Sequence, residues 1–111
     1  TQVVGNEIEK VEKLYKAMNL HFKFFARIQR FQTISKKEEI EENLEKLRED
    51  VEKMKELEIF DEEVENQLVK TFSNLSKIWS GYDKEIADMF IAEANRYSHK
   101  TYSFEAKEVA P

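Results

Sequence analysis

The side chains best suited to acid–base or metal chemistry are scarce in this chain of 111 residues, which has two histidines and no cysteine. A carboxylate-bridged metal site in a helical bundle places a Glu three residues before a His. Met18 stands at that spacing before His21, and Arg96 before His99. The missing thiols exclude disulfides, zinc–thiolate sites and cysteine nucleophiles. We therefore expect no catalytic residue, no metal and no cofactor, and hence a protein that is not an enzyme.

Glu93 is the most unusual carboxylate, because it falls in register with the apolar residues of its segment. A charge on an apolar helix face needs a partner. We expect it to form an ion pair with Arg27 or Arg30 of the first segment, or to be solvated where the bundle frays. A general base is the alternative, although no nucleophile or second acid accompanies Glu93.

The elements that position these side chains are predicted to be helices. The chain has only 2 Gly and 1 Pro, so residues that form β-turns are few. Apolar residues instead recur at steps of three and four, which is the helical period. We expect helices at about 7–32, 36–58 and 62–98 and a loosely ordered tail at 100–111, all within a single domain, 1–111.

These segments predict an all-α fold, an up-down-up three-helix bundle with long helices. Ser80 and Gly81 interrupt the third helix, and a break near Gly81 would give a four-helix bundle instead. Because the third helix is much longer than the second, a second copy of the chain could complete the bundle by dimerisation.

Three residues are predicted to start these helices. Asn6 has a side chain suited to an N-cap, and Asp61 has another. Ser35 with Glu38 matches a capping box ahead of the second helix. That second helix carries a narrow, coiled-coil-like seam, which we expect to be buried. The seam consists of Ile40, Leu44, Leu47, Val51 and Met54.

The first helix combines aromatic and basic residues, a mixture that could bind a polyanion. On a helical wheel the two kinds separate, and this segregation disfavours a nucleic-acid surface. The apolar stripe expected to face the core is Ile8, Val11, Tyr15, Met18, Phe22 and Phe25. The basic stripe is Lys16, Lys23, Arg27 and Arg30. We expect the acidic surface of the second helix, or water, to neighbour this basic stripe.

Some apolar residues lie beyond an ordinary core stripe and are the candidate interface. In the first helix they are Leu20, Phe24 and Phe31, which we expect another helix to cover. From the third segment we add Trp79, Phe90 and Tyr97.

Charge is distributed unevenly along the chain, whose net charge is −5. Residues 1–35 carry 6 basic and 3 acidic side chains, or +3, whereas residues 36–65 carry 6 and 14, or −8. The first two segments therefore have an electrostatic reason to lie together.

The sequence thus favours a non-enzymatic helical interaction or assembly module that self-associates as a homodimer or binds another protein. One alternative is a peripheral membrane-surface module that uses the basic stripe. A second alternative is a helical bundle that holds a ligand or metal. We expect a cytoplasmic location, the default for a chain that lacks cysteine.

Overall fold

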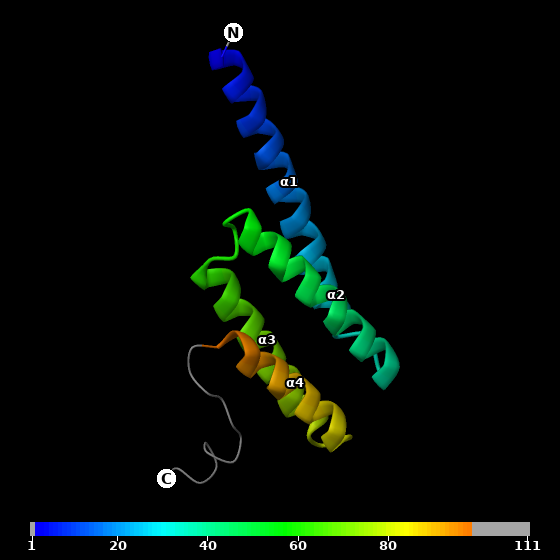
Figure 1. Ribbon diagram of the computed structural model, residues 1–111. Helices are drawn as coiled ribbons and strands as arrows, with labels where there is room; N and C mark the ends of the chain where they lie inside the picture. The colour runs from blue at the N-terminus through cyan, green and yellow to red at the C-terminus, as the bar shows by residue number, and fades with distance from the viewer. Residues whose placement is uncertain (1, 99–111) are drawn as a thin grey trace. The chain divides into compact units, whose positions relative to one another are not determined.

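The computed structural model describes residues 2–98, and this part of the chain contains helices and no strand (Figure 1). The all-α fold class predicted from the sequence is confirmed. The helices are α1 (Gln2–Arg30), α2 (Lys37–Glu56), α3 (Glu62–Trp79) and α4 (Lys84–Tyr97). The predicted tail at 100–111, together with His99, lies outside the described residues.

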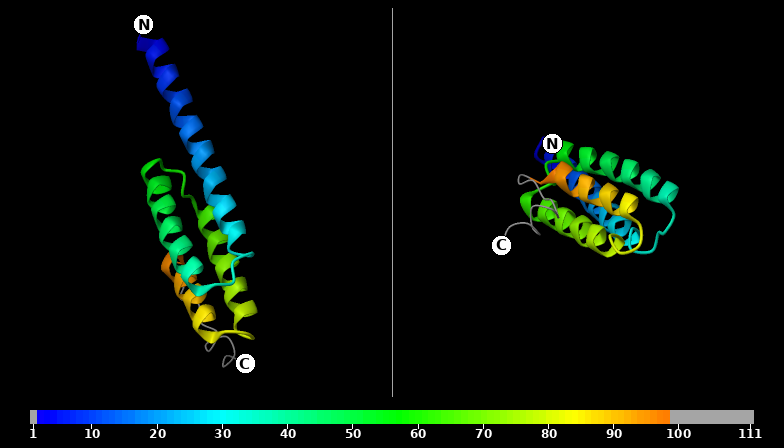
Figure 2. Two further views of the ribbon diagram at one scale, coloured as in Figure 1. Left: turned by 90° about the vertical axis from the view of Figure 1, so that its right-hand side faces the viewer. Right: turned by 90° about the horizontal axis from the view of Figure 1, so that it is seen from below.

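The helices group in two pairs. The chain divides into two compact units, and the boundary lies between Phe60 and Asp61. The first unit is an antiparallel hairpin of α1 and α2, and the second is an antiparallel hairpin of α3 and α4 (Figures 1 and 2). α1 has 29 residues and α2 has 20. The N-terminal part of α1 therefore extends past the end of α2 (Figure 2).

The start of α1 differs from the prediction. A helix from residue 7 with Asn6 as its N-cap was expected, but α1 begins at Gln2 and runs through Gly5 and Asn6. Both residues are poor helix formers, at a cost of up to about 1 kcal/mol each relative to Ala. Unlike Pro, neither removes a backbone hydrogen bond, so the helix continues through them.

The start of α2 lies close to the predicted position, but the predicted capping box at Ser35 is wrong. The N-cap is Lys36, whose backbone is extended and whose side chain makes no capping hydrogen bond. The amide of Ile40 donates to the Lys36 carbonyl at 3.0 Å, which fixes this start. Ser35 is thus one residue too early to cap. Glu38 and Glu39 still occupy the first turn, where the helix dipole favours negative charge.

The predicted continuous helix over 62–98 is wrong, and the alternative break near Gly81 is confirmed. Asp83 caps α4, accepting hydrogen bonds from the amides of Glu85 at 3.0 Å and Ile86 at 3.3 Å. Gly81 does not adopt a positive φ, so the turn does not depend on the backbone freedom of glycine. A carboxylate that caps a new helix accounts for the break.

The second hairpin begins as predicted, since the Asp61 side chain accepts a hydrogen bond from the Val64 amide at 2.9 Å. Its two helices are joined by stacked rings of Phe72 and Phe90, with centroids 5.8 Å apart. In the first hairpin the predicted seam of α2 is confirmed as buried. Its members are Ile40, Leu44, Leu47, Val51 and Met54.

The turn that ends α2 determines where the chain leaves the first hairpin. Glu58 has a φ of 60°, the left-handed conformation that usually falls to glycine. Its amide donates to the Lys55 carbonyl at 3.0 Å, and the Ile59 amide donates to the Met54 carbonyl at 2.9 Å. These two bonds form a Schellman motif. The motif directs Ile59 and Phe60 back toward α1.

We predict that Glu58→Gly stabilises the protein, because glycine adopts this left-handed conformation without the steric cost that Glu has. The free energy of unfolding should rise by about 0.5–1 kcal/mol, measured by urea denaturation. Glu49→Gly, at an exposed position inside α2, is the control and should lower it by about 0.8 kcal/mol. A loss of stability from both substitutions would contradict this account of the turn.

Candidate interaction surface

The middle of α1 is held by the turn that follows α2. Phe24 is fully buried, and its ring meets the edge of the Phe60 ring with centroids 6.4 Å apart. One turn earlier, Nε2 of the half-buried His21 lies 3.4 Å from the Ile59 carbonyl oxygen. These contacts hold the middle of α1, at His21 and Phe24, beside the turn that ends α2. His21 therefore has a structural role here.

A buried carboxylate joins α1 and α2 about two helical turns before the end of α2. Asp50 of α2 is only 2% exposed, and Arg27 donates from Nε to its Oδ2 at 2.8 Å. Lys23 Nζ lies 3.7 Å from Oδ1. These two residues of the basic stripe thus contact a carboxylate of the second helix, but it is a buried one beside the apolar seam and not part of the exposed acidic surface that was expected. The sequence reasoning missed Asp50, although it lies three residues after Leu47 and four before Met54, beside the apolar seam.

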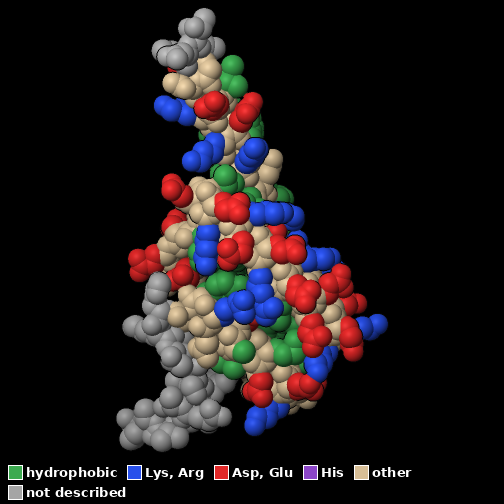
Figure 3. All heavy atoms as spheres, viewed as in Figure 1, with side chains coloured by type: hydrophobic (Ala, Val, Ile, Leu, Met, Phe, Trp, Pro, Cys, Tyr) green, Lys and Arg blue, Asp and Glu red, His purple; other side chains and the backbone are tan. Residues whose placement is uncertain are grey.

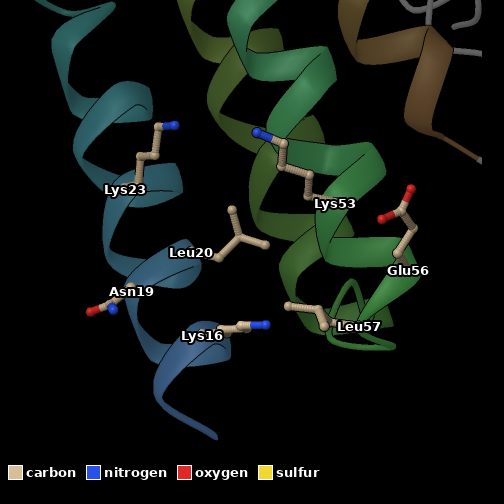
Figure 4. Close-up of a pocket in the computed structure, with 7 residues that line it drawn as sticks. All are labelled: Lys16, Asn19, Leu20, Lys23, Lys53, Glu56 and Leu57. Atoms are coloured by element: carbon tan, nitrogen blue, oxygen red, sulfur yellow. The ribbon is translucent and has the colours of Figure 1, made fainter. Parts of the chain in front are cut away.

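A pocket of about 490 Å³ lies between α1 and α2 near the end of α2 (Figure 4). Leu20 and Leu57 point toward each other across it, while Lys16 and Lys23 reach from α1 toward α2. Leu20, a predicted interface residue, is thus partly covered within its own hairpin. Of the basic stripe, Arg27 is held in the α1–α2 contact, whereas the Lys23 side chain is 54% exposed and Lys16 and Arg30 are exposed as well.

The opposite side of α1 is apolar and exposed, which reverses the sequence interpretation of this helix. Five residues of the stripe expected to face the core are at the surface and the sixth, Phe25, is half-buried, whereas Phe24 and Phe31, expected at an interface, are buried. Phe22 is 80% exposed, the largest fraction among the hydrophobic side chains that the structure describes in α1. The exposed residues, which we call the α1 stripe, are Ile8, Val11, Leu14, Tyr15, Met18 and Phe22. Figure 3 shows hydrophobic side chains on this part of α1 between Lys and Glu side chains.

The reversal has a simple geometric reason. At about 100° per residue, Phe24 lies about 160° from Phe22 on the wheel, so the two aromatics cannot face the same neighbour. In its middle turns, α1 therefore carries apolar side chains on two opposite sides, with Phe22 on one and Phe24 on the other. The turn after α2 and the Asp50 carboxylate engage the Phe24 side, and the α1 stripe is left outside.

A shallow groove of about 520 Å³ lies at the C-terminal end of the α1 stripe. All of its lining comes from α1, so it is a depression between side chains of one helix. The lining residues are Met18, His21, Phe22, Phe25, Ala26 and Gln29. Aromatic rings form its walls, and Ala26 leaves space between them.

The predicted site residues of the second unit lie mainly in its interior. Phe90 is fully buried and Tyr97 is 8% exposed, whereas Trp79 is half-buried at the end of α3. Glu93 is buried and accepts a hydrogen bond from the Tyr97 hydroxyl at 3.1 Å. Its expected ion pair with Arg27 or Arg30 would join the two units, and it stays a prediction.

Comparison with protein-family models, with curated proteins and with solved structures finds no match for this chain. Within residues 2–98 there is no group of three or more His, Asp or Glu side chains arranged to hold a metal ion. No helix in the same range is long and apolar enough to cross a membrane.

We predict that Asp50→Ala destabilises the first hairpin, because it leaves the Arg27 guanidinium, 15% exposed, without its carboxylate. The loss should be about 3 kcal/mol in the free energy of unfolding, followed by urea denaturation. Glu42→Ala is the matched control, since Glu42 pairs with Lys46 at 3.1 Å on the exposed side of the same helix. Its loss should stay below about 0.5 kcal/mol. Equal losses would show that the Asp50 pair does not hold the hairpin.

Proposed function

We propose that this chain is a non-enzymatic helical interaction module that assembles with a second copy of itself through the α1 stripe. The observation that carries the proposal is the exposure of six large hydrophobic side chains along one side of one helix. Isolated apolar residues are common on protein surfaces, whereas contiguous apolar patches usually mark interaction sites.

The spacing of the α1 stripe supports a helix as the partner. Ile8, Val11, Tyr15, Met18 and Phe22 follow alternating steps of three and four residues. That heptad pattern is the seam of a coiled coil, in which each apolar residue inserts between residues of a facing helix. The part of α1 that extends past α2 can receive such a helix without displacing α2.

The charges beside the stripe favour a protein partner over an anionic membrane. Between residues 5 and 15, α1 carries three Glu and two Lys, a net charge of −1. Helices that bind anionic lipid instead carry many Lys and Arg beside their apolar face. Farther along α1, Arg27 contributes little to such a surface, because its side chain is 15% exposed and lies against Asp50.

We predict that the double variant Met18→Lys, Phe22→Lys weakens self-association at least about 100-fold, because each copy places two charges in an apolar seam. The measurement is sedimentation equilibrium of the wild type and the variant over a range of concentrations. Circular dichroism should show unchanged helicity, since both side chains are exposed in the single chain.

The control is Ile78→Lys, Tyr82→Lys, which changes two exposed hydrophobic residues outside α1 (61% and 84% exposed). It should leave the dissociation constant unchanged. A wild type that stays monomeric at every concentration would overturn the proposal. So would binding to anionic vesicles that depends on Met18 and Phe22 in a chain that does not self-associate.

A further inference from the structure

We infer that the two copies pair antiparallel along α1, with Val11 of each copy packed against Phe22 of the other. This inference rests on the proposed self-association and adds its orientation and register. In an antiparallel pair centred between Tyr15 and Met18, the seam residues meet in symmetric layers. The layers pair Ile8 with Phe25, Val11 with Phe22, and Tyr15 with Met18.

In this register the groove on α1 receives two side chains of the second copy. In knobs-into-holes packing, a side chain inserts into a hole formed by four residues of the facing helix. The hole opposite Val11 of the second copy is formed by Met18, His21, Phe22 and Phe25. The next hole, opposite Ile8 of the second copy, is formed by Phe22, Phe25, Ala26 and Gln29. Together these two holes contain the six residues that line the groove.

Side-chain size also favours the antiparallel orientation. Each antiparallel layer joins one aromatic ring to one smaller or more flexible side chain. A parallel pair would instead set Phe22 against Phe22 and Ile8 against Ile8, which makes the seam wide at one end and narrow at the other. Facing large and small residues fill an interface more evenly, and the unbranched Met18 adapts its shape to the ring of Tyr15.

The charges that flank the seam point to the same orientation. A parallel pair places Glu7 of one copy opposite Glu12 of the other on both sides of the seam, where like charges repel. The antiparallel pair places Glu12 opposite Asn19 and Leu14 opposite His21. No like charges then face each other, and Leu14 finds a ring to pack on. The exposure of Leu14 in the single chain is 60%.

Cysteine cross-linking tests the orientation cleanly, because the chain has no cysteine of its own. Val11→Cys and Phe22→Cys are made as separate full-length chains, and one carries a tag that changes its mass. Equal amounts are mixed under reducing conditions and then oxidised. A disulfide needs Cα atoms within about 7 Å, whereas positions 11 and 22 are about 17 Å apart along the helix.

The antiparallel register predicts that the disulfide between Val11→Cys and Phe22→Cys exceeds either homodisulfide at least tenfold. A parallel pair predicts the reverse, with each variant linking to itself. Sedimentation of both reduced variants confirms that they still self-associate.

A dimer in which the mixed disulfide does not predominate overturns the antiparallel register and leaves the proposed self-association standing. A wild type that never self-associates overturns both. The two proposals can therefore fail separately.

Discussion

The ion pair between Asp50 and Arg27 fixes the rotation of α1 about its own axis, and the surface of the first hairpin depends on that rotation. α1 has apolar side chains on two sides at the level of its middle turns, so hydrophobic burial alone does not select one. The buried Asp50 carboxylate does select the side of α1 that faces α2, because it needs a cation as its partner and Arg27 is adjacent to the Phe24 side. The contact of Phe24 with Phe60 further stabilises this rotation of α1. The α1 stripe is exposed as a consequence.

The sequence predicted the elements well where periodicity is strong and one face is apolar. The seam of α2 is the clearest case, since its other faces are almost entirely charged and only one rotation buries apolar surface. Periodicity could not predict which side of α1 turns inward, because Phe24 and Phe31 compete with the α1 stripe. A signal was nevertheless present. Asp50 flanks the α2 seam, and a charge at that position indicates where a basic residue of the neighbouring helix must lie.

Among the three predicted N-caps, Asn6, Ser35 and Asp61, only Asp61 caps its helix. The Asp61 side chain accepts a hydrogen bond from the Val64 amide, whereas Ser35 matched the sequence pattern but lies one residue before the N-cap. Between α3 and α4, the interruption was assigned to Gly81 because glycine is a poor helix former. The structure attributes it to Asp83, whose side chain offers the backbone a new start. A pattern of residue types does not specify which of several neighbouring residues terminates a helix.

Self-association would also explain why a long helix extends past its partner. The part of α1 beyond α2 includes Gly5 and Asn6, and an isolated helix of fewer than about 12–15 residues is marginal in water. Packing of an apolar face supplies most of the stability of helices in proteins, and α2 does not reach this part. A second copy laid along the α1 stripe would bury Ile8 and Val11 and stabilise the same turns. Folding of this end and assembly would then be coupled, so that the stability of α1 would depend on protein concentration.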